Sequence, residues 1–137
     1  MIHTIITSTA GQGLWEITSD VQAVITGSGA DTGLCTLFMR HTSASLLIQE
    51  NADQSARQDL ESWLNRLVPE VDSLYTHTYE GPDDMPAHIK SMLTQTNLAI
   101  PFTDSRLLLG TWQGIFLWEH RHRSHTRQVI VHIMEDK

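Results

Sequence analysis

The fold is decided by the stretch Trp112-Gln113-Gly114-Ile115-Phe116-Leu117-Trp118-Glu119-His120-Arg121-His122. Its run of aromatic and aliphatic residues predicts a β-strand over residues 112–121, and successive side chains of a strand point to opposite faces. On one face we expect Phe116, Trp118, His120 and His122. On the other face we expect Ile115, Leu117, Glu119 and Arg121. The first face should be buried at its aromatic start, which brings His120 to the edge of the core.

Further strands are predicted on both sides of this one. Short runs of apolar and β-branched residues, bounded by turn residues, mark them. They cover residues 2–8, 13–18, 34–39, 43–49, 97–102, 106–109 and 127–134.

Three helices interrupt the strands. The first is expected to be capped by Ser19 or Asp20 and ended by Gly27. The second opens at Asn51 or Asp53 and stops before Pro69. Its apolar residues recur at helical spacing, at Ala56, Leu60, Leu64 and Leu67. The third is capped by Asp84, has Pro86 in its first turn, and turns its apolar residues to the core: Ile89, Met92 and Leu93.

This mixed order of strands and helices predicts an α+β domain with mostly antiparallel sheets, because a parallel sheet would need regular βαβ alternation. The 137 residues fit a single domain over 1–137. Cys35 is the only cysteine and is expected to be a buried, unreactive thiol.

Charge and hydropathy limit the classes of partner. The formal net charge of −7 disfavours nucleic-acid binding, which needs a basic face. No basic start or long apolar run follows Met1, so neither export nor a membrane span is predicted, and the cytoplasm is expected. Eight histidines are the outlier of the composition, and histidine is the commonest metal ligand.

Two histidines and three carboxylates crowd the stretch from His77 to His88. Imidazoles and carboxylates together suit a divalent ion such as zinc. The alternative is that Asp83 and Asp84 only cap the helix that follows.

Two other polar segments are candidates. Arg40-His41-Thr42-Ser43-Ala44-Ser45 either binds an oxyanion or is an ordinary polar strand end. The segment from His120 to Arg127 holds three histidines, three arginines and no acid. It predicts a phosphorylated small-molecule partner, with a solvated hairpin tip as the alternative. For the predicted strand, a separate alternative is that His120 and His122 are solvated residues at its end.

Three ordered motifs resemble the YjbQ-like proteins, a family described as secondary thiamine-phosphate synthases. They span most of the chain, although Asn97 and Ser105 stand where serine and glycine are common. The motifs are His41-Thr42-Ser43-Ala44-Ser45-Leu46 with Glu50-Asn51, His77 to Lys90, and Gly110-Thr111-Trp112-Gln113-Gly114-Ile115 with Glu119-His120-Arg121.

The resemblance implies two packed sheets, a homotrimer and a histidine metal site. The implied ligands are His77, His88 and His120, with His41 or His122 as alternatives for the third, and zinc is the expected ion, with magnesium if pyrophosphate shares it. Our candidate catalytic residues are Asp84, Glu119 and His41. Our candidate substrate-binding residues are Arg40, Ser43, Thr111, Gln113, Arg121 and Arg123.

The implied reaction joins a pyrimidine diphosphate to a thiazole phosphate and releases pyrophosphate. Histidine-bound zinc is better suited to activating water, so this reaction is expected to be a side activity if the native step is a metal-assisted hydrolysis or lyase reaction. The remaining hypothesis is a non-enzymatic trimer whose metal has a structural role.

Overall fold

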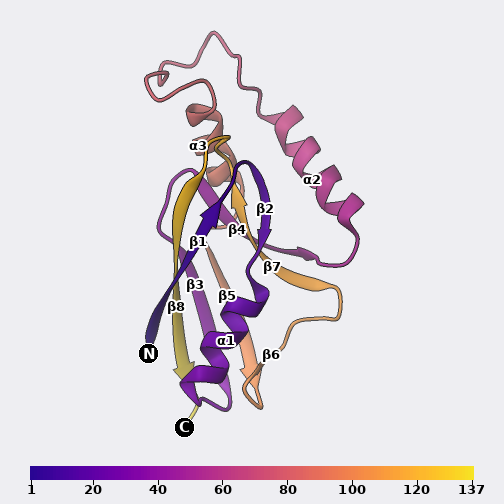
Figure 1. Cartoon of the computed structure of the whole chain (residues 1–137), viewed down its shortest axis with the longest axis vertical. Coiled ribbons are helices and arrows are strands. Elements are labelled where there is room, and N and C mark those ends of the chain that lie inside the picture. The colour runs from indigo at the N-terminus through magenta and orange to yellow at the C-terminus, as the bar shows by residue number, and fades with distance from the viewer.

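The computed structural model describes residues 1–137 as two antiparallel sheets with three helices (Figure 1). In chain order the elements are β1 (Ile2–Thr9), β2 (Gly13–Glu16), α1 (Thr18–Ser28), β3 (Gly33–Met39), β4 (Ala44–Glu50), α2 (Gln54–Leu67), α3 (Asp84–Leu93), β5 (Asn97–Thr103), β6 (Arg106–Leu107), β7 (Gln113–Glu119) and β8 (His125–Glu135). One sheet has the order β1-β8-β3-β5-β6 and the other β2-β7-β4. The predicted α+β class with two antiparallel sheets is confirmed.

The main hydrophobic core is formed by one face of each sheet together with α1. Alternate residues of β8, Val129, Val131 and Ile133, enter it, and β7 contributes Ile115 and Leu117 from the other sheet. Cys35 is fully buried here, and burial raises the pKa of its thiol to about 11. The prediction of a buried thiol is confirmed.

The other face of β7 packs beneath α2. Trp118 joins Leu64 and Val68 in a smaller apolar cluster, and the guanidinium of Arg57 lies 5.6 Å from the ring centre of Phe116. Both faces of β7 are therefore buried, and its residues divide between them as the alternation predicted.

Several strand limits differ from the prediction. β7 ends at Glu119 because its partner strands both begin there: Gly13 of β2 and Ala44 of β4 pair with Glu119. Residues 120–122 consequently lie beyond the strand. β2 stops at Glu16, β6 has only two residues, and β8 extends from His125 to Glu135.

The ends of α1 were also predicted wrongly. Ile17 takes the N-cap position without a side-chain cap, and the helix runs through Gly27 to Ser28, with Gly29 as its C-cap. Gly29 adopts a left-handed φ of 73°, which favours glycine and closes the helix. For α2, Asp53 is confirmed as the cap, because its carboxylate accepts the Ser55 N–H.

Helix α3 departs from its prediction in two ways. Asp83, not Asp84, takes the N-cap position, and its side chain makes no cap hydrogen bond. Met92 and Leu93 are 74% and 52% exposed, so the prediction that they face the core is wrong. The buried positions of α3 are instead Asp84, Pro86, Ala87 and Lys90.

The hairpin between β5 and β6 turns on Asp104 and Ser105, whose φ angles are 52° and 59°. Two successive left-handed residues suit a tight hairpin, which explains why glycine is expected at position 105. Ser105 is held there because its hydroxyl donates to the Ala30 carbonyl oxygen and its N–H donates to that of Asp31.

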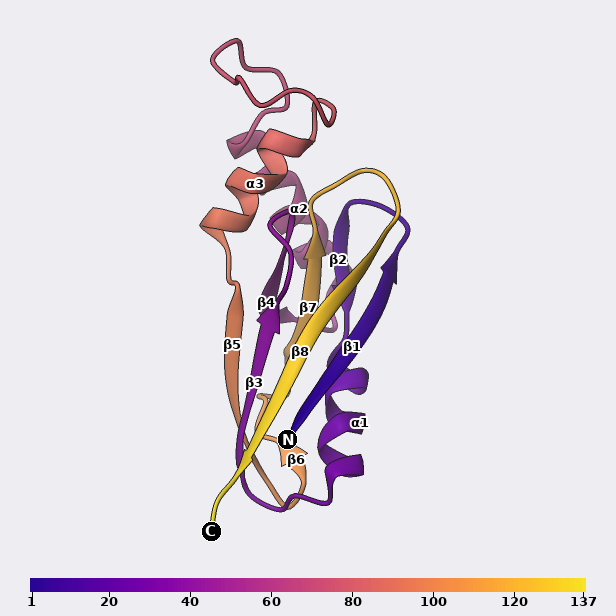
Figure 2. The same ribbon diagram turned by 90° about the vertical axis from the view of Figure 1, so that its left-hand side faces the viewer.

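One end of the molecule gathers α3, the β1–β2 turn and the β7–β8 connection, opposite both chain termini (Figures 1 and 2). Contacts tie these segments together: the N–H of His122 donates to Asp83, and Gln12 donates to the carbonyl oxygen of His120. None of the three helices has the length and apolar character needed to cross a membrane.

Candidate functional site

The candidate site lies at this end, where the 68–83 loop meets α3. The loop supplies His77, and α3 supplies Asp84 and His88, which are one helical turn apart. One ligand atom from each residue lies within 4.8 Å of the other two. The two imidazole rings meet edge to face, with centres 5.2 Å apart.

His88 is fixed so that one ring nitrogen faces a carboxylate. Its Nδ1 atom lies 3.1 Å from the Thr42 carbonyl oxygen, which can only accept a hydrogen bond. Its Nε2 atom lies 3.1 Å from Asp84 Oδ2, a second acceptor. A neutral imidazole has one proton for these two acceptors, and a cation bound between Nε2 and Oδ2 would satisfy both contacts, with the proton of Nδ1 donated to Thr42.

His77 reaches the same oxygen. Its Nε2 atom lies 2.6 Å from Asp84 Oδ2, and its side chain is 45% exposed. Two imidazole nitrogens and one carboxylate oxygen therefore converge at the protein surface. This donor set fits a divalent ion, and zinc in particular.

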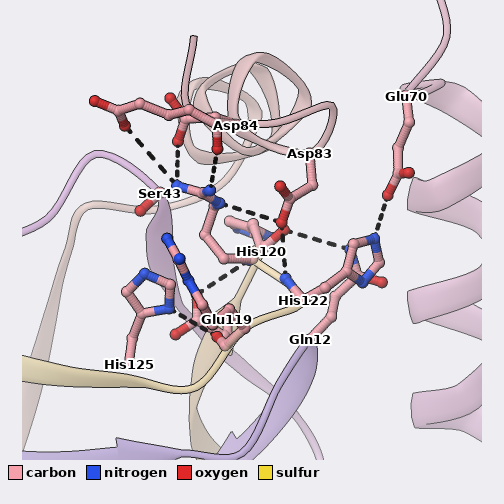
Figure 3. A network of polar contacts seen from close by, with 12 residues as sticks. Gln12, Ser43, Glu70, Asp83, Asp84, Glu119, His120, His122 and His125 are labelled. Atoms are coloured by element: carbon pink, nitrogen blue, oxygen red, sulfur yellow. Dashed lines mark hydrogen bonds and ion pairs between the residues drawn. The ribbon is translucent and has the colours of Figure 1, made fainter. Parts of the chain in front are cut away.

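Arg121 orients Asp84. Figure 3 shows the dashed lines that reach the carboxylates of Asp84 and Asp83. The guanidinium Nη1 donates to Asp84 Oδ1 at 2.6 Å, Nε donates to Asp83 Oδ2 at 3.1 Å, and Nη2 donates to the Glu80 carbonyl oxygen. The other oxygen of Asp84, Oδ2, is left for the histidines. Arg121, a candidate substrate ligand, is thus buried and held in ion pairs.

Both aspartates are held ionised. Burial raises the pKa of Asp84, but the hydrogen bond from His77 and the charge of Arg121 outweigh it, so the pKa lies below its ordinary value. For Asp83 the burial effect is likewise outweighed, by the N–H of His122 and by Arg121, and its pKa is also lowered. A carboxylate that stays ionised is suited to binding a cation.

A second ion pair lies inside the protein. Glu119 is fully buried, and it accepts hydrogen bonds from Arg127 and Thr9. Arg127 also donates to Ser43 Oγ at 3.0 Å. Burial would raise the pKa of Glu119, but the hydrogen bonds from Arg127 and Thr9 lower it below its ordinary value. Glu119 and Ser43, predicted as catalytic and substrate-binding residues, therefore belong to a closed internal network.

His120 is buried and separate from the ligand group. It is 1% exposed, its Nε2 atom lies 2.9 Å from Ser45 Oγ, and its Nδ1 atom has no partner. Burial, reinforced by the charges of Lys90 and Arg127, lowers its pKa to about 3. The reading of His120 as a solvated strand-end residue is wrong. His122 does fit it, being half exposed and paired with Glu70.

The other predicted site residues are dispersed. Arg123 is exposed on the β7–β8 connection. Thr111 and Gln113 lie at the opposite end of β7 from His120, where their carbonyl oxygens accept from the side chain of Asn51. Arg40 and His41 follow β3, close to His88, and line one pocket with it.

Sequence reasoning missed two buried charged residues. Arg127 occupies an inward position of β8, with Val129 and Val131 on the same face, and a charge there requires a buried partner. Lys90 is 2% exposed and donates to Asn65 Oδ1 at 2.6 Å. The signal for Lys90 is its helical spacing from the buried Pro86 and Ala87.

Comparisons with known proteins agree with this architecture. The family model "UPF0047 protein YjbQ-like" matches residues 3–136. The chain is 56% identical to the UPF0047 protein sll1880 of Synechocystis over 94% of this chain and 88% of that protein, and 43% identical to YjbQ of Salmonella typhimurium over 93% of each.

Solved structures share the fold. Protein TT1486 of Thermus thermophilus superposes with a TM-score of 0.86 at 36% identity, covering 96% of this chain and 99% of that one. A YjbQ/UPF0047 family protein of Clostridium acetobutylicum gives a TM-score of 0.84 at 34% identity, covering 98% and 99%. With its fold, its motifs and nearly its whole length matched, the chain belongs to the YjbQ-like UPF0047 family.

Proposed function

We propose that this chain is a metal-dependent enzyme acting on a small phosphorylated molecule, with its centre at His77, Asp84 and His88. The observation that carries the proposal is the geometry of His88, whose Nδ1 atom is fixed on the Thr42 carbonyl while Nε2 faces Asp84 Oδ2. The donor set favours zinc, because magnesium prefers oxygen ligands throughout. Magnesium is the alternative if substrate pyrophosphate supplies those oxygens.

The residues of the centre have separate tasks. His77 and His88 supply imidazole nitrogens, and Asp84 supplies Oδ2 while Arg121 holds its other oxygen. A divalent ion held by these residues would polarise a phosphoryl oxygen or lower the pKa of a water molecule. With only three protein ligands, such a site would resemble catalytic zinc sites, whereas structural sites have four protein ligands.

The family resemblance supplies the first reaction to test, the joining of a pyrimidine diphosphate to a thiazole phosphate with loss of pyrophosphate. A metal-assisted hydrolase or lyase is the second candidate, and the two histidine ligands favour it because imidazole-bound zinc is suited to activating water. A non-enzymatic metal-binding trimer is the third reading, and a fourth protein ligand would favour it.

The trimer is part of the proposal. The outer face of β1, β8 and β3 carries no helix in Figure 2, and it exposes large apolar side chains. These include Ile2, Ile6, Leu34 and Met134. An uncovered apolar sheet face of this kind supports assembly with further copies.

We also propose that the protein is cytoplasmic. We further propose that it does not bind nucleic acid, because its net charge is −7.

Turnover by metal-stripped and reloaded protein tests the function. Synthesis and phosphate-ester hydrolysis are assayed with zinc or magnesium, using Asp84→Asn and, as a control, Asp59→Asn on the exposed surface of α2. We expect metal to restore activity and Asp84→Asn to lower it by more than about 100-fold. Equal turnover by stripped protein, or by Asp84→Asn, would refute the proposal.

A further inference from the structure

A pocket of about 540 Å³ opens beside the candidate metal centre, between the end of β3 and α3. The two sites share His88, which lines the pocket and whose Nε2 atom faces Asp84. Ser91 and Met92 continue the same wall along the next turn of α3. A molecule in this pocket is therefore in contact with a residue of the centre.

The pocket presents hydrogen-bond donors. Arg40 makes one side-chain hydrogen bond, to Gln128 Oε1, so most of its guanidinium is free. The Nε2 atom of His41 accepts the Gln128 N–H at 2.8 Å, which places the ring proton on Nδ1 as a further donor. Thr42 and Thr96, which carry hydroxyls, also line the pocket. No carboxylate lines the pocket, so its polar side is complementary to an oxyanion.

The remaining wall is apolar and exposed. Phe38 is 48% exposed and Met92 is 74% exposed, and both line the pocket. Ligand sites commonly combine such a wall with a few polar groups that fix orientation. The pocket thus suits a small molecule with an apolar body and an anionic group at one end.

We infer that this pocket binds an oxyanion-bearing small molecule, with Arg40 and His41 holding the anion and with Phe38 and Met92 against its apolar body. That this molecule is the substrate of the neighbouring metal centre rests on the proposed function, whereas its binding to the pocket does not. The anion would thus bind in this pocket and not at the basic segment of residues 120–127. Arg121 and Arg127 of that segment are buried in ion pairs.

Direct binding tests the inference. Phenyl phosphate and benzoate are titrated into the metal-stripped full chain by calorimetry, and the pair distinguishes a phosphate from a carboxylate ligand. Arg40→Gln is expected to weaken binding of the preferred probe by about 10–100-fold, the effect of losing a hydrogen bond to a charged group. Arg106→Gln, on the exposed surface of β6, is the matched control and should bind like the parent.

Three outcomes would overturn the inference. They are the absence of saturable binding of either probe at millimolar concentration, unchanged binding by Arg40→Gln, and loss of binding in Arg123→Gln alone. Repeating the titration with Asp84→Asn separates the inference from the proposed function. If Asp84→Asn binds the probe like the parent, the pocket is supported even if the metal centre fails. If Arg40→Gln binds the probe like the parent while metal uptake is intact, only the pocket is refuted.

Discussion

The Nε2 atom of His88 lies 3.1 Å from Oδ2 of Asp84, one helical turn away, while Nδ1 on the opposite side of the ring lies 3.1 Å from the Thr42 carbonyl oxygen. This pair is built by three segments far apart in sequence. α3 places both side chains, the segment after β3 fixes the orientation of the His88 ring, and Arg121 fixes the carboxylate. The predictions below test these separate contributions.

Arg121→Met should destabilise the fold strongly. It removes the guanidinium from two aspartates, of which Asp84 is 2% exposed, and leaves their charges unpaired. Breaking a buried ion pair in this way costs about 3–5 kcal/mol in the free energy of unfolding. Urea denaturation measures the loss, and Arg123→Met, at an exposed position, is the control. Equal stability of the two variants would mean that Arg121 does not support the site.

Trp118→Ala should be costly because its side chain fills the space under α2 with Leu64 and Val68. The expected loss is about 3–5 kcal/mol, from transfer and cavity formation. Trp112, which is 64% exposed, provides the matched control, and Trp112→Ala should change the free energy of unfolding little. A melting temperature of Trp118→Ala equal to that of the parent would contradict the assignment of the strand face.

Acid should weaken the fold through His120. Burial, with the charges of Lys90 and Arg127, lowers the pKa of His120 from 6.5 to about 3. Between pH 6.5 and about 3, the unfolded chain therefore binds more protons than the native chain. The stabilisation is complete above pH 6.5 and is lost as the pH falls toward 3. Urea denaturation should show a slope that approaches about 1.4 kcal/mol per pH unit.

The variant His120→Gln should lose this part of the slope, whatever its stability at neutral pH. His3→Gln, at an exposed position, should keep it. The same pH slope in His120→Gln and the parent would show that His120 is not the titrating group.

The sheet face predicts an oligomer. Light scattering should give three times the subunit mass of 15.5 kDa. Ile6→Asp, on the 65% exposed side chain of β1, should dissociate the assembly because a charge would be buried at the interface. Trp63→Asp introduces the same charge at an exposed apolar residue of α2 and should leave the mass of the assembly unchanged. A monomer across micromolar concentrations would end this part of the proposal.

The sequence predicted the faces of β7 because alternation is a local property of a strand. It placed Phe116 and Trp118 on one side and Ile115 and Leu117 on the other, as found. The end of the strand at Glu119 could not be predicted from the sequence, since that end depends on where β2 and β4 begin to pair with β7. The same limit affected α3, because an apolar residue such as Met92 is buried only if another element covers it.

The site was predictable in part. The density of histidines and carboxylates marks the 77–88 stretch, the family resemblance implies His77 and His88 as ligands, and the structure brings these two together with Asp84. The direction of His120 into the interior, toward Ser45, was not readable from spacing, because it depends on the turn that follows β7. The burial of Arg127 and Lys90 was not predicted, because a charged residue in an apolar pattern is expected to be exposed unless its buried partner is known.

Zinc uptake by the stripped protein tests the central claim most directly. Affinity and stoichiometry are measured at pH 7.5 by competition with a chromophoric chelator, for the parent, His77→Ala, His88→Ala, Asp84→Asn and the surface control Asp59→Asn. The account predicts one ion per chain, a loss of affinity beyond about 100-fold in each of the three site variants, and no change in the control. Full zinc content with parental affinity in His77→Ala and His88→Ala would contradict it.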